Sequence, residues 1–219
     1  PQMIERILPP AVTPAEAFTD PPEATLLPEE EPIIAKAVDK RRREFTTVRY
    51  CARQALAKLG IPPLPILPGE KGAPTWPDGI VGSMTHCKGY RAAVVAHAAD
   101  VVTVGIDAEP HIQLPDGVLN ATTCATERVH LAELAETHPD IHWDKLLFAA
   151  KESVYKAWFP LMRKWLGFED ARVTFDPAGT FEAELVVPGP VIAGEQIGGF
   201  SGRWLVDDGL AVTAITILA

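Results

Sequence analysis

The stretch VGIDAE at residues 104–109 closes a β-rich run and is the most informative part of the sequence. Side chains two residues apart on a strand point to the same side, so Asp107 and Glu109 would present two carboxylates together while Ile106 points into the core. Two hard oxygen ligands beside an open face suit Mg²⁺, which keeps several waters and takes further ligands from a phosphate-bearing substrate. The alternative is a solvated strand end that carries two acids, a common arrangement.

Short Val- and Ala-rich runs surround this stretch. Segments 91–97 and 101–107 are separated by the turn-prone residues 98–100, and this spacing predicts a β-hairpin. Turn signals rich in Asp and Gly follow at 176–179 and 207–209. They separate further predicted strands at 171–175, 181–187, 203–206 and 210–218.

A strong helix is predicted over residues 144–159, ended by Pro160 because the residue before a proline disfavours the helical region. At about 100° per residue its apolar side chains gather on one face. Glu152 and Lys156 fall on the opposite face, one turn apart, with Lys151 at the border. Taken alone, this is the spacing of a stabilising Glu–Lys pair. The core face is expected to hold Leu147, Ala150, Val154, Ala157, Trp158 and Leu161.

Glu152 has a second interpretation when the helix is combined with the strand end. It would join Asp107 and Glu109 in a three-carboxylate site, and three like charges close together are unfavourable unless a cation neutralises them. Lys151 and Lys156 would add positive charge for a pyrophosphate on the same metal. The two segments together therefore predict a divalent-cation site that handles phosphate.

A second helix, predicted over residues 33–59, follows a Pro- and Glu-rich segment, 1–32, which we expect to be an extended lead-in. Arg41 and Arg49 lie about two turns apart and share a face of this helix. A nucleotide phosphate could sit against both, because arginine binds phosphate in bidentate fashion. The alternative is a solvated basic face. A Pro- and Gly-rich loop follows over residues 60–80.

Hydroxyl residues beside a histidine form a third candidate site, in the sequence GSMTHC at 82–87. We expect a turn in which Ser83 or Thr85 donates a hydrogen bond to a phosphate and His86 donates with or without a charge. A histidine in a polar turn without a ligand is the alternative. Lys71, in the loop GEKG at 69–72, is a further phosphate candidate of low specificity.

Two other kinds of site are disfavoured by the spacing of their residues. A hydrolase triad of Ser83, His86 and Asp107 would need a G-x-S-x-G elbow, which the sequence lacks. His138 and His142 are four residues apart but lack the H-E-x-x-H pattern of a zinc protease.

Composition excludes several classes of protein. With 219 residues, of which 47% are apolar, the chain is long enough to bury a real core. No apolar run is long enough for a membrane span, and we see no secretory signal. The three cysteines are far apart and favour neither disulfides nor a thiolate zinc site, which fits a cytoplasmic protein. The net charge of −9 argues against a nucleic-acid partner.

Each half of the chain contains a basic helix followed by strands. This order predicts an α+β fold of two lobes, each about a hundred residues long, a normal size for a small domain. We expect an N-terminal lobe at 1–105 and a C-terminal lobe at 106–219, and a monomeric protein.

Three motifs together resemble the 4'-phosphopantetheinyl transferase family, in its two-lobed, single-chain branch. They are GSMTHCKGY at 82–90, VGIDAE at 104–109 and FAAKESVYKAWFP at 148–160. The segments KRRREFTTVRYCAR at 40–53 and WPDG at 76–79 are similar to actinobacterial members. The resemblance implies two similar lobes in a pseudo-twofold arrangement, with the active site in the cleft between them.

The resemblance also implies an activity, which is transfer of the 4'-phosphopantetheine of coenzyme A to a serine of an apo acyl or peptidyl carrier protein. Such carriers serve polyketide, non-ribosomal peptide or fatty-acid synthesis. The serine attacks the β-phosphorus, Glu152 or a water on the metal takes its proton, and 3',5'-ADP leaves. The implied roles are Mg²⁺ (or Mn²⁺) ligation by Asp107, Glu109 and Glu152, catalysis by Glu152 and Lys156, and coenzyme A contacts by Arg41, Arg49, Lys71, Ser83, Thr85, His86, Lys151 and Lys156. Within that set, the resemblance implies that Thr85 and His86 bind the 3'-phosphate of coenzyme A.

Two rival functions stay open at this point. A non-catalytic module could bind coenzyme A without transferring anything, although such a module has no need to keep a proton acceptor. A two-metal phosphotransferase would require a second cluster of acids, and the sequence shows none.

Overall fold

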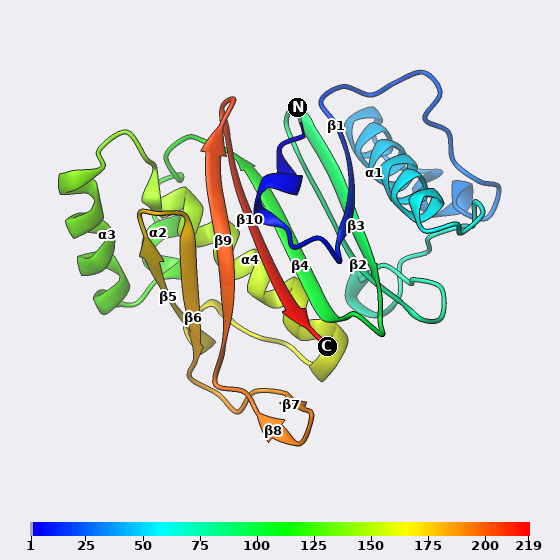
Figure 1. Ribbon diagram of the computed structural model, residues 1–219. Coiled ribbons are helices and arrows are strands. Elements are labelled where there is room, and N and C mark those ends of the chain that lie inside the picture. Colours follow the sequence, from blue (N-terminus) through cyan, green and yellow to red (C-terminus); the bar gives the residue numbers. More distant parts are fainter. Residues whose placement is uncertain (1) are drawn as a thin grey trace. The chain divides into compact units, whose positions relative to one another are not determined.

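A computed structural model describes residues 2–219 (Figure 1). The chain divides into two compact units, one of Pro1–Val104 with Leu218–Ala219 and one of Gly105–Ile217. Each unit combines helices with antiparallel strands, which confirms the α+β fold class. None of the described helices is long and apolar enough to cross a membrane.

The first unit is built on a three-stranded sheet in the order β1-β3-β2, with the helix α1 packed against it. Its core joins Cys51, Ala52 and Leu56 of α1 to Ala93 and Val95 of β3. Strand β3 is central and is buried along nearly its whole length, and residues 92–96 form its continuous apolar part. The elements of this unit are η1 (Ile4–Ile7), β1 (Thr13–Ala17), η2 (Glu31–Ile34), α1 (Asp39–Lys58), η3 (Glu70–Gly72), β2 (Ile80–Cys87) and β3 (Tyr90–His97).

The second unit is built on a five-stranded sheet in the order β4-β10-β9-β6-β5. Strands β5 and β6 alternate strictly between buried and exposed residues, because one face is covered by α3 and α4 and the other faces solvent. The elements, beginning with the strand that enters this unit, are β4 (Val101–Pro110), α2 (Val118–Thr122), α3 (Ala125–Thr137), α4 (Trp143–Met162), η4 (Phe168–Asp170), β5 (Ala171–Asp176), β6 (Thr180–Leu185), β7 (Val191–Ile192), β8 (Glu195–Gln196), β9 (Gly199–Asp207) and β10 (Leu210–Leu218).

The predicted hairpin of residues 91–97 and 101–107 is wrong. Strand β3 pairs with β1 and β2, whereas β4 lies beside β10 in the other sheet. The turn between them therefore passes the chain from one sheet to the next. Apolar runs and a turn signal cannot distinguish this passage from a hairpin, because both need the same local conformations.

Three further segments of the first unit differ from expectation. The lead-in contains a strand, β1, which the sequence hides because Pro14 is tolerated only at an edge position such as this one. Residues 82–87, predicted as a turn, belong to strand β2, which pairs along its whole length with β3. The helix expected over 33–59 begins only at Asp39, after the short 3-10 turn η2.

Helix α4 continues past the proline that was expected to end it. Pro160 lies in the last turn, where the only intrahelical bond it removes is the one from its own nitrogen to the carbonyl of Lys156. The helix ends at Met162, and the following residue, Arg163, adopts a left-handed conformation and donates its N–H to the Phe159 carbonyl at 2.9 Å. The predicted apolar face is buried, except that Leu161 is only half-buried.

Helices α2 and α3 were not predicted from the sequence. The buried residues of α3 are Glu127, Leu131 and Leu134, so its apolar stripe is too sparse to detect in the sequence.

Candidate functional site

The end of strand β4 carries the two carboxylates that the sequence singled out. Asp107 is buried, at 6% exposure, and Glu109 is half-buried and hydrogen-bonded to it. Burial, followed by the charge and the hydrogen bond of Asp107, raises the pKa of Glu109 to about 8. Two carboxylates in contact cannot both ionise freely, so a proton or a cation has to lie between them.

Helix α4 brings a lysine and a third carboxylate toward the same strand end. Lys156 Nζ lies 3.0 Å from Asp107 Oδ1 and donates to the Ile106 carbonyl at 2.8 Å. Burial, followed by the charge of Asp107, raises the pKa of Glu152, and Lys156 opposes this shift. The charged residues of strand and helix thus interact with one another. A change of charge on Asp107 would alter both the proton affinity of Glu152 and the ion pair with Lys156.

The predicted three-carboxylate metal site stays a prediction. Within residues 2–219, no three or more His, Cys, Asp or Glu side chains are close enough together to hold a metal ion. The Lys156 ammonium is paired with Asp107, and burial together with Asp107 raises the pKa of Glu109 to about 8. The donors are hard carboxylate oxygens on adjacent elements, a set whose chemistry fits a divalent cation.

A glycine sets the distance between strand and helix. A Cβ added to Gly105 would meet the Ser153 carbonyl and come within 2.7 Å of the Ala157 nitrogen. Strand β4 and helix α4 therefore approach each other backbone to backbone, which is possible only without a side chain at this position. This contact explains the glycine of the VGIDAE stretch, a signal that the sequence carried but that was not interpreted.

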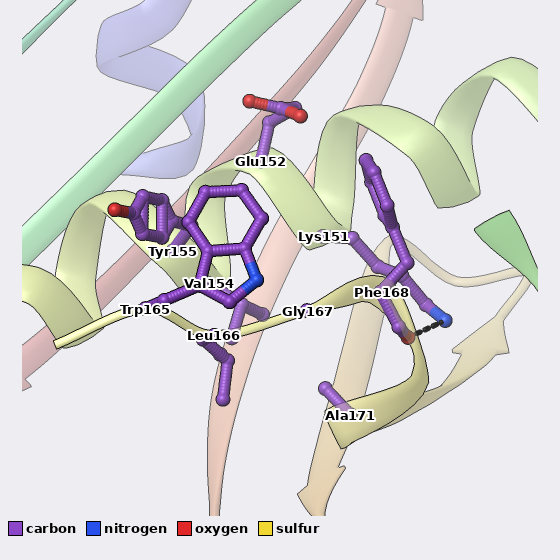
Figure 2. Close-up of a pocket in the computed structure, with 9 residues that line it drawn as sticks. All are labelled: Lys151, Glu152, Val154, Tyr155, Trp165, Leu166, Gly167, Phe168 and Ala171. Atoms are coloured by element: carbon purple, nitrogen blue, oxygen red, sulfur yellow. Dashed lines mark hydrogen bonds between the residues drawn. The ribbon is translucent and has the colours of Figure 1, made fainter.

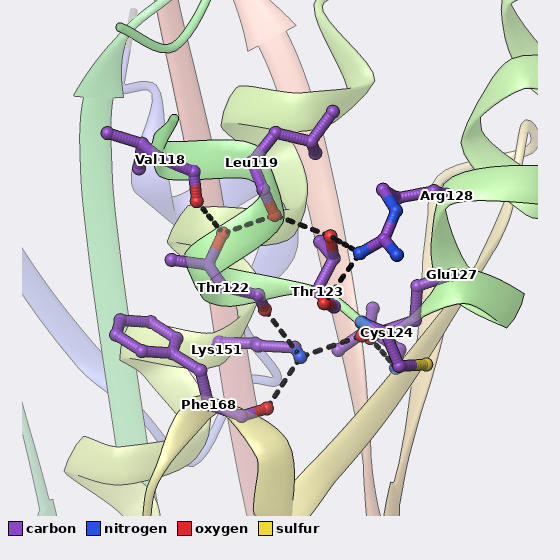
Figure 3. A network of polar contacts seen from close by, with 10 residues as sticks. Val118, Leu119, Thr122, Thr123, Cys124, Glu127, Arg128, Lys151 and Phe168 are labelled. Carbon is purple, nitrogen blue, oxygen red and sulfur yellow. Dashed lines mark hydrogen bonds and ion pairs between the residues drawn. The ribbon is translucent and has the colours of Figure 1, made fainter. Parts of the chain in front are cut away.

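The Lys151 side chain is buried and bonded to other parts of the protein. Its Nζ is buried and donates to the Thr122 carbonyl at 2.8 Å, to Glu127 Oε1 at 2.9 Å and to the Phe168 carbonyl at 2.7 Å (Figure 3). An ammonium has three N–H donors, and all three are satisfied by protein acceptors. The predicted contact of Lys151 with coenzyme A is therefore replaced by a structural role.

Glu127, which sequence reasoning missed, completes this network. Its Oε1 also accepts the N–H of Cys124, and its Oε2 accepts the N–H of Val173 on the edge strand β5, at 2.8 Å. The sequence signal was a Glu three residues into a helix, the position of a capping box.

An aromatic pocket of about 160 Å³ lies beside Glu152. Figure 2 shows Trp165 next to Tyr155, with their ring centroids 5.2 Å apart, and Lys151 directed to the Phe168 carbonyl. Trp165 is 65% exposed, a high value for an indole, so this wall of the pocket is accessible from solvent. The lining is completed by Val154, Leu166, Gly167 and Ala171.

The two arginines predicted to contact a nucleotide phosphate lie against the same aromatic side chain of helix α1. Arg41 and Arg49 both place their guanidinium groups over Phe45, at 5.7 and 3.5 Å from its centroid. Arg41 is exposed, whereas Arg49 is buried and donates Nε to the Ile66 carbonyl at 2.8 Å. Burial lowers the pKa of Arg49 to about 10, a cost that Glu30 partly offsets.

The histidine and hydroxyl residues point to opposite faces of strand β2. Successive side chains of a strand alternate, so Ser83 and Thr85, both 3% exposed, lie on one face and His86 on the other. The expected joint grip of the Thr85 and His86 side chains on one phosphate therefore does not follow from this geometry. Lys71 is exposed on the 3-10 turn η3, with a positive φ of 53°.

Family models and known proteins match this chain over most of its length. Residues 29–96 match the 4'-phosphopantetheinyl transferase N-terminal domain, and residues 103–204 match the 4'-phosphopantetheinyl transferase superfamily. The transferase Svp of Streptomyces mobaraensis is 56% identical over 99% of this chain and 90% of its own length. PptT of Mycobacterium tuberculosis is 53% identical over 93% of this chain and 91% of its own. Npt of Nocardia iowensis is 51% identical over 97% and 99%. The chain therefore belongs to the 4'-phosphopantetheinyl transferase family.

Proposed function

We propose that this enzyme transfers the 4'-phosphopantetheine of coenzyme A to a serine hydroxyl of an apo acyl or peptidyl carrier protein and releases 3',5'-ADP. The single observation that carries the proposal is the charged group formed by Asp107, Glu109, Glu152 and Lys156, in a chain 56% identical to a named transferase. A module that only binds coenzyme A has no use for a desolvated carboxylate beside a lysine.

Asp107, Glu109 and Glu152 are the residues that would hold Mg²⁺, or Mn²⁺, in this proposal. A bound divalent cation would supply positive charge to the oxygens of the coenzyme A pyrophosphate. The hydrogen bond between Asp107 and Glu109 supports the assignment, because a carboxylate pair that is costly to ionise becomes favourable once a cation lies beside it.

Glu152 is the proposed general base. Its raised pKa gives it a stronger affinity for a proton than an ordinary surface carboxylate has, which suits it to take the proton of the attacking serine. Lys156 is 30% exposed at its side chain and is paired with Asp107, and we assign its positive charge to the phosphoryl oxygens of the substrate. Positioning and electrostatics supply most of the catalysis in this scheme.

The aromatic pocket is the proposed site of the pantetheine arm. That arm is uncharged, and a pocket lined by Tyr155, Trp165, Leu166 and Phe168 offers apolar walls beside the proposed base. We assign the nucleotide end to Arg41 and His86, which are accessible, with Arg49 as the buried charge behind them. The contacts expected of Lys71, Ser83 and Thr85 stay predictions.

We place the reaction in the cytoplasm, since Cys51, Cys87 and Cys124 are all free thiols.

The test is a mass measurement on the carrier. The protein is incubated with a panel of apo carriers, coenzyme A and Mg²⁺, with a parallel reaction that contains a chelator. A gain of one phosphopantetheine that depends on the metal supports the proposal. Tight coenzyme A binding with every carrier unchanged in mass would overturn it in favour of a non-catalytic binding module.

A further inference from the structure

Helix α1 carries a carboxylate where its apolar stripe begins. Glu44 is 8% exposed and occupies the same face as Val48, Cys51 and Ala55, which are each 3% exposed or less. Residues spaced by three and four along a helix share a face, so this position would ordinarily be apolar. A charge at such a place is costly unless a partner compensates it.

The partner is His86. Glu44 Oε2 lies 3.3 Å from His86 Nδ1, and the two side chains are 10% and 36% exposed. His86 lies on the same face of β2 as Met84, which packs against the core of α1. The imidazole therefore spans the distance from a nearly buried carboxylate to the surface.

This contact fixes the orientation of the ring and places a carboxylate beside it. With Nδ1 against the carboxylate, Nε2 lies on the opposite side of the imidazole from Glu44. A neighbouring carboxylate favours the doubly protonated ring, in which Nε2 is a donor, over the neutral form, in which Nε2 would be an acceptor. A ring held in this way is suited to an anionic group and unsuited to a cationic one.

The charges on the same end of helix α1 agree with an anionic ligand. Arg41 precedes Glu44 by three residues and places its guanidinium over Phe45. The next two arginines of the run are held by carboxylates, Arg42 by Glu31 and Arg43 by Asp39. Arg41 lies one turn before Glu44 on the same helix, so it adds positive charge near this end of α1.

We propose that Glu44 is a positioning residue that holds His86 in the orientation and charge needed to bind the 3'-phosphate of coenzyme A. This inference rests on the proposed function, in which His86 contacts the nucleotide. Glu44 itself does not touch the phosphate. Its carboxylate acts through the imidazole, as outer partners act through the histidines that they orient.

The experiment compares coenzyme A with 3'-dephospho-coenzyme A as substrate, because the two differ only in the phosphate at issue. Glu44→Gln keeps the size of the side chain and removes its charge. Asp39→Asn is the matched control, since it removes one negative charge from the start of the same helix, at a position paired with Arg43. Thermal unfolding of each variant confirms that it is folded before kinetics are measured.

We expect Glu44→Gln to raise the KM for coenzyme A about tenfold, the order seen when an outer partner of a histidine is lost, with little change in kcat. With 3'-dephospho-coenzyme A the variant should match wild type. The double variant with His86→Ala should be no worse than His86→Ala alone. The nitrogen shifts of the His86 ring should move from the doubly protonated toward the neutral form in Glu44→Gln.

Equal effects on both substrates, a fall in kcat alone, or an effect matched by Asp39→Asn would each overturn the proposal. Failure of the proposed function is seen separately, as wild-type protein that modifies no carrier. In that case direct binding of the two nucleotides by calorimetry still tests Glu44, because the difference in affinity between them should shrink in Glu44→Gln.

Discussion

The Nζ of Lys151 lies 2.9 Å from Oε1 of Glu127, and both side chains are only 3% exposed. The pair ties helix α4 to helix α3, and through Glu127 Oε2 to the edge strand β5. Glu152 follows Lys151 directly on α4, so the same network fixes the helix that carries the proposed base.

Replacement of Lys151 by Met should therefore cost stability. Removal of one partner leaves a buried charge uncompensated, and we expect the free energy of unfolding to fall by about 3–5 kcal/mol in urea denaturation. Lys156→Met is the comparison on the same helix, and it should cost less because that side chain is 30% exposed. Unchanged stability of Lys151→Met together with a raised KM for coenzyme A would return this lysine to the binding site.

Gly105→Ala should separate strand β4 from helix α4. The added methyl group has no room against the Ser153 carbonyl and the Ala157 nitrogen, so we expect a loss of about 1–3 kcal/mol in stability and a marked fall in transfer. Gly198→Ala is the control, because a Cβ there meets no atom within 4 Å. A Gly105→Ala protein as active and stable as wild type would contradict the close approach.

Glu152→Ala should abolish transfer and largely spare coenzyme A binding. Loss of a positioned general base costs about 10²–10⁴-fold in rate, and the groups assigned to the nucleotide lie in the other unit of the chain. Single-turnover kinetics and calorimetry measure the two quantities separately. Undiminished turnover of this variant would refute the role of Glu152.

A divalent cation should stabilise the free protein. Mg²⁺ relieves the repulsion between Asp107 and Glu109, so we expect a rise in Tm that grows with metal concentration. Asp107→Asn should remove most of this rise, and sodium chloride at equal ionic strength should not reproduce it. A wild-type Tm that does not change with Mg²⁺ concentration would count against these residues as ligands, independently of any activity measurement.

His111 should make the second unit less stable in mild acid. Burial, followed by the charge of His142, lowers the pKa of His111 below its ordinary 6.5, and its Nε2 accepts the His142 N–H at 2.9 Å. Above pH 6.5 the ring is neutral in both the folded and unfolded states, so its contribution is fully present. As the pH falls below 6.5 the unfolded state binds the proton first, and stability is lost down to the folded-state pKa.

The measurement for His111 is urea unfolding at about pH 7.5 and about pH 5.5. His111→Gln is the control, because an amide oxygen can accept the same N–H without titrating. Wild type should lose more stability than the variant across this range. Equal losses in the two proteins would show that another group is responsible.

The grouping of the charged residues on one strand end and on one helix face could be predicted, because it depends on local spacing. The alternation that places Asp107 and Glu109 together, and the helical spacing that brings Glu152 and Lys156 to one face, depend only on neighbours in the chain. The pairing of strands could not be predicted in this way, since β3 and β4 have the composition of a hairpin and yet lie in different sheets.

By itself, then, the sequence determined the α+β class, the helix and strand that carry the acidic residues, and the family to which the motifs belong. Only the tertiary structure decided that Lys151 is buried against Glu127 rather than exposed to a ligand, and that Glu44 reaches His86. The physical reason is that the charge state and exposure of a side chain depend on partners 24 and 42 residues away, and no local pattern specifies them.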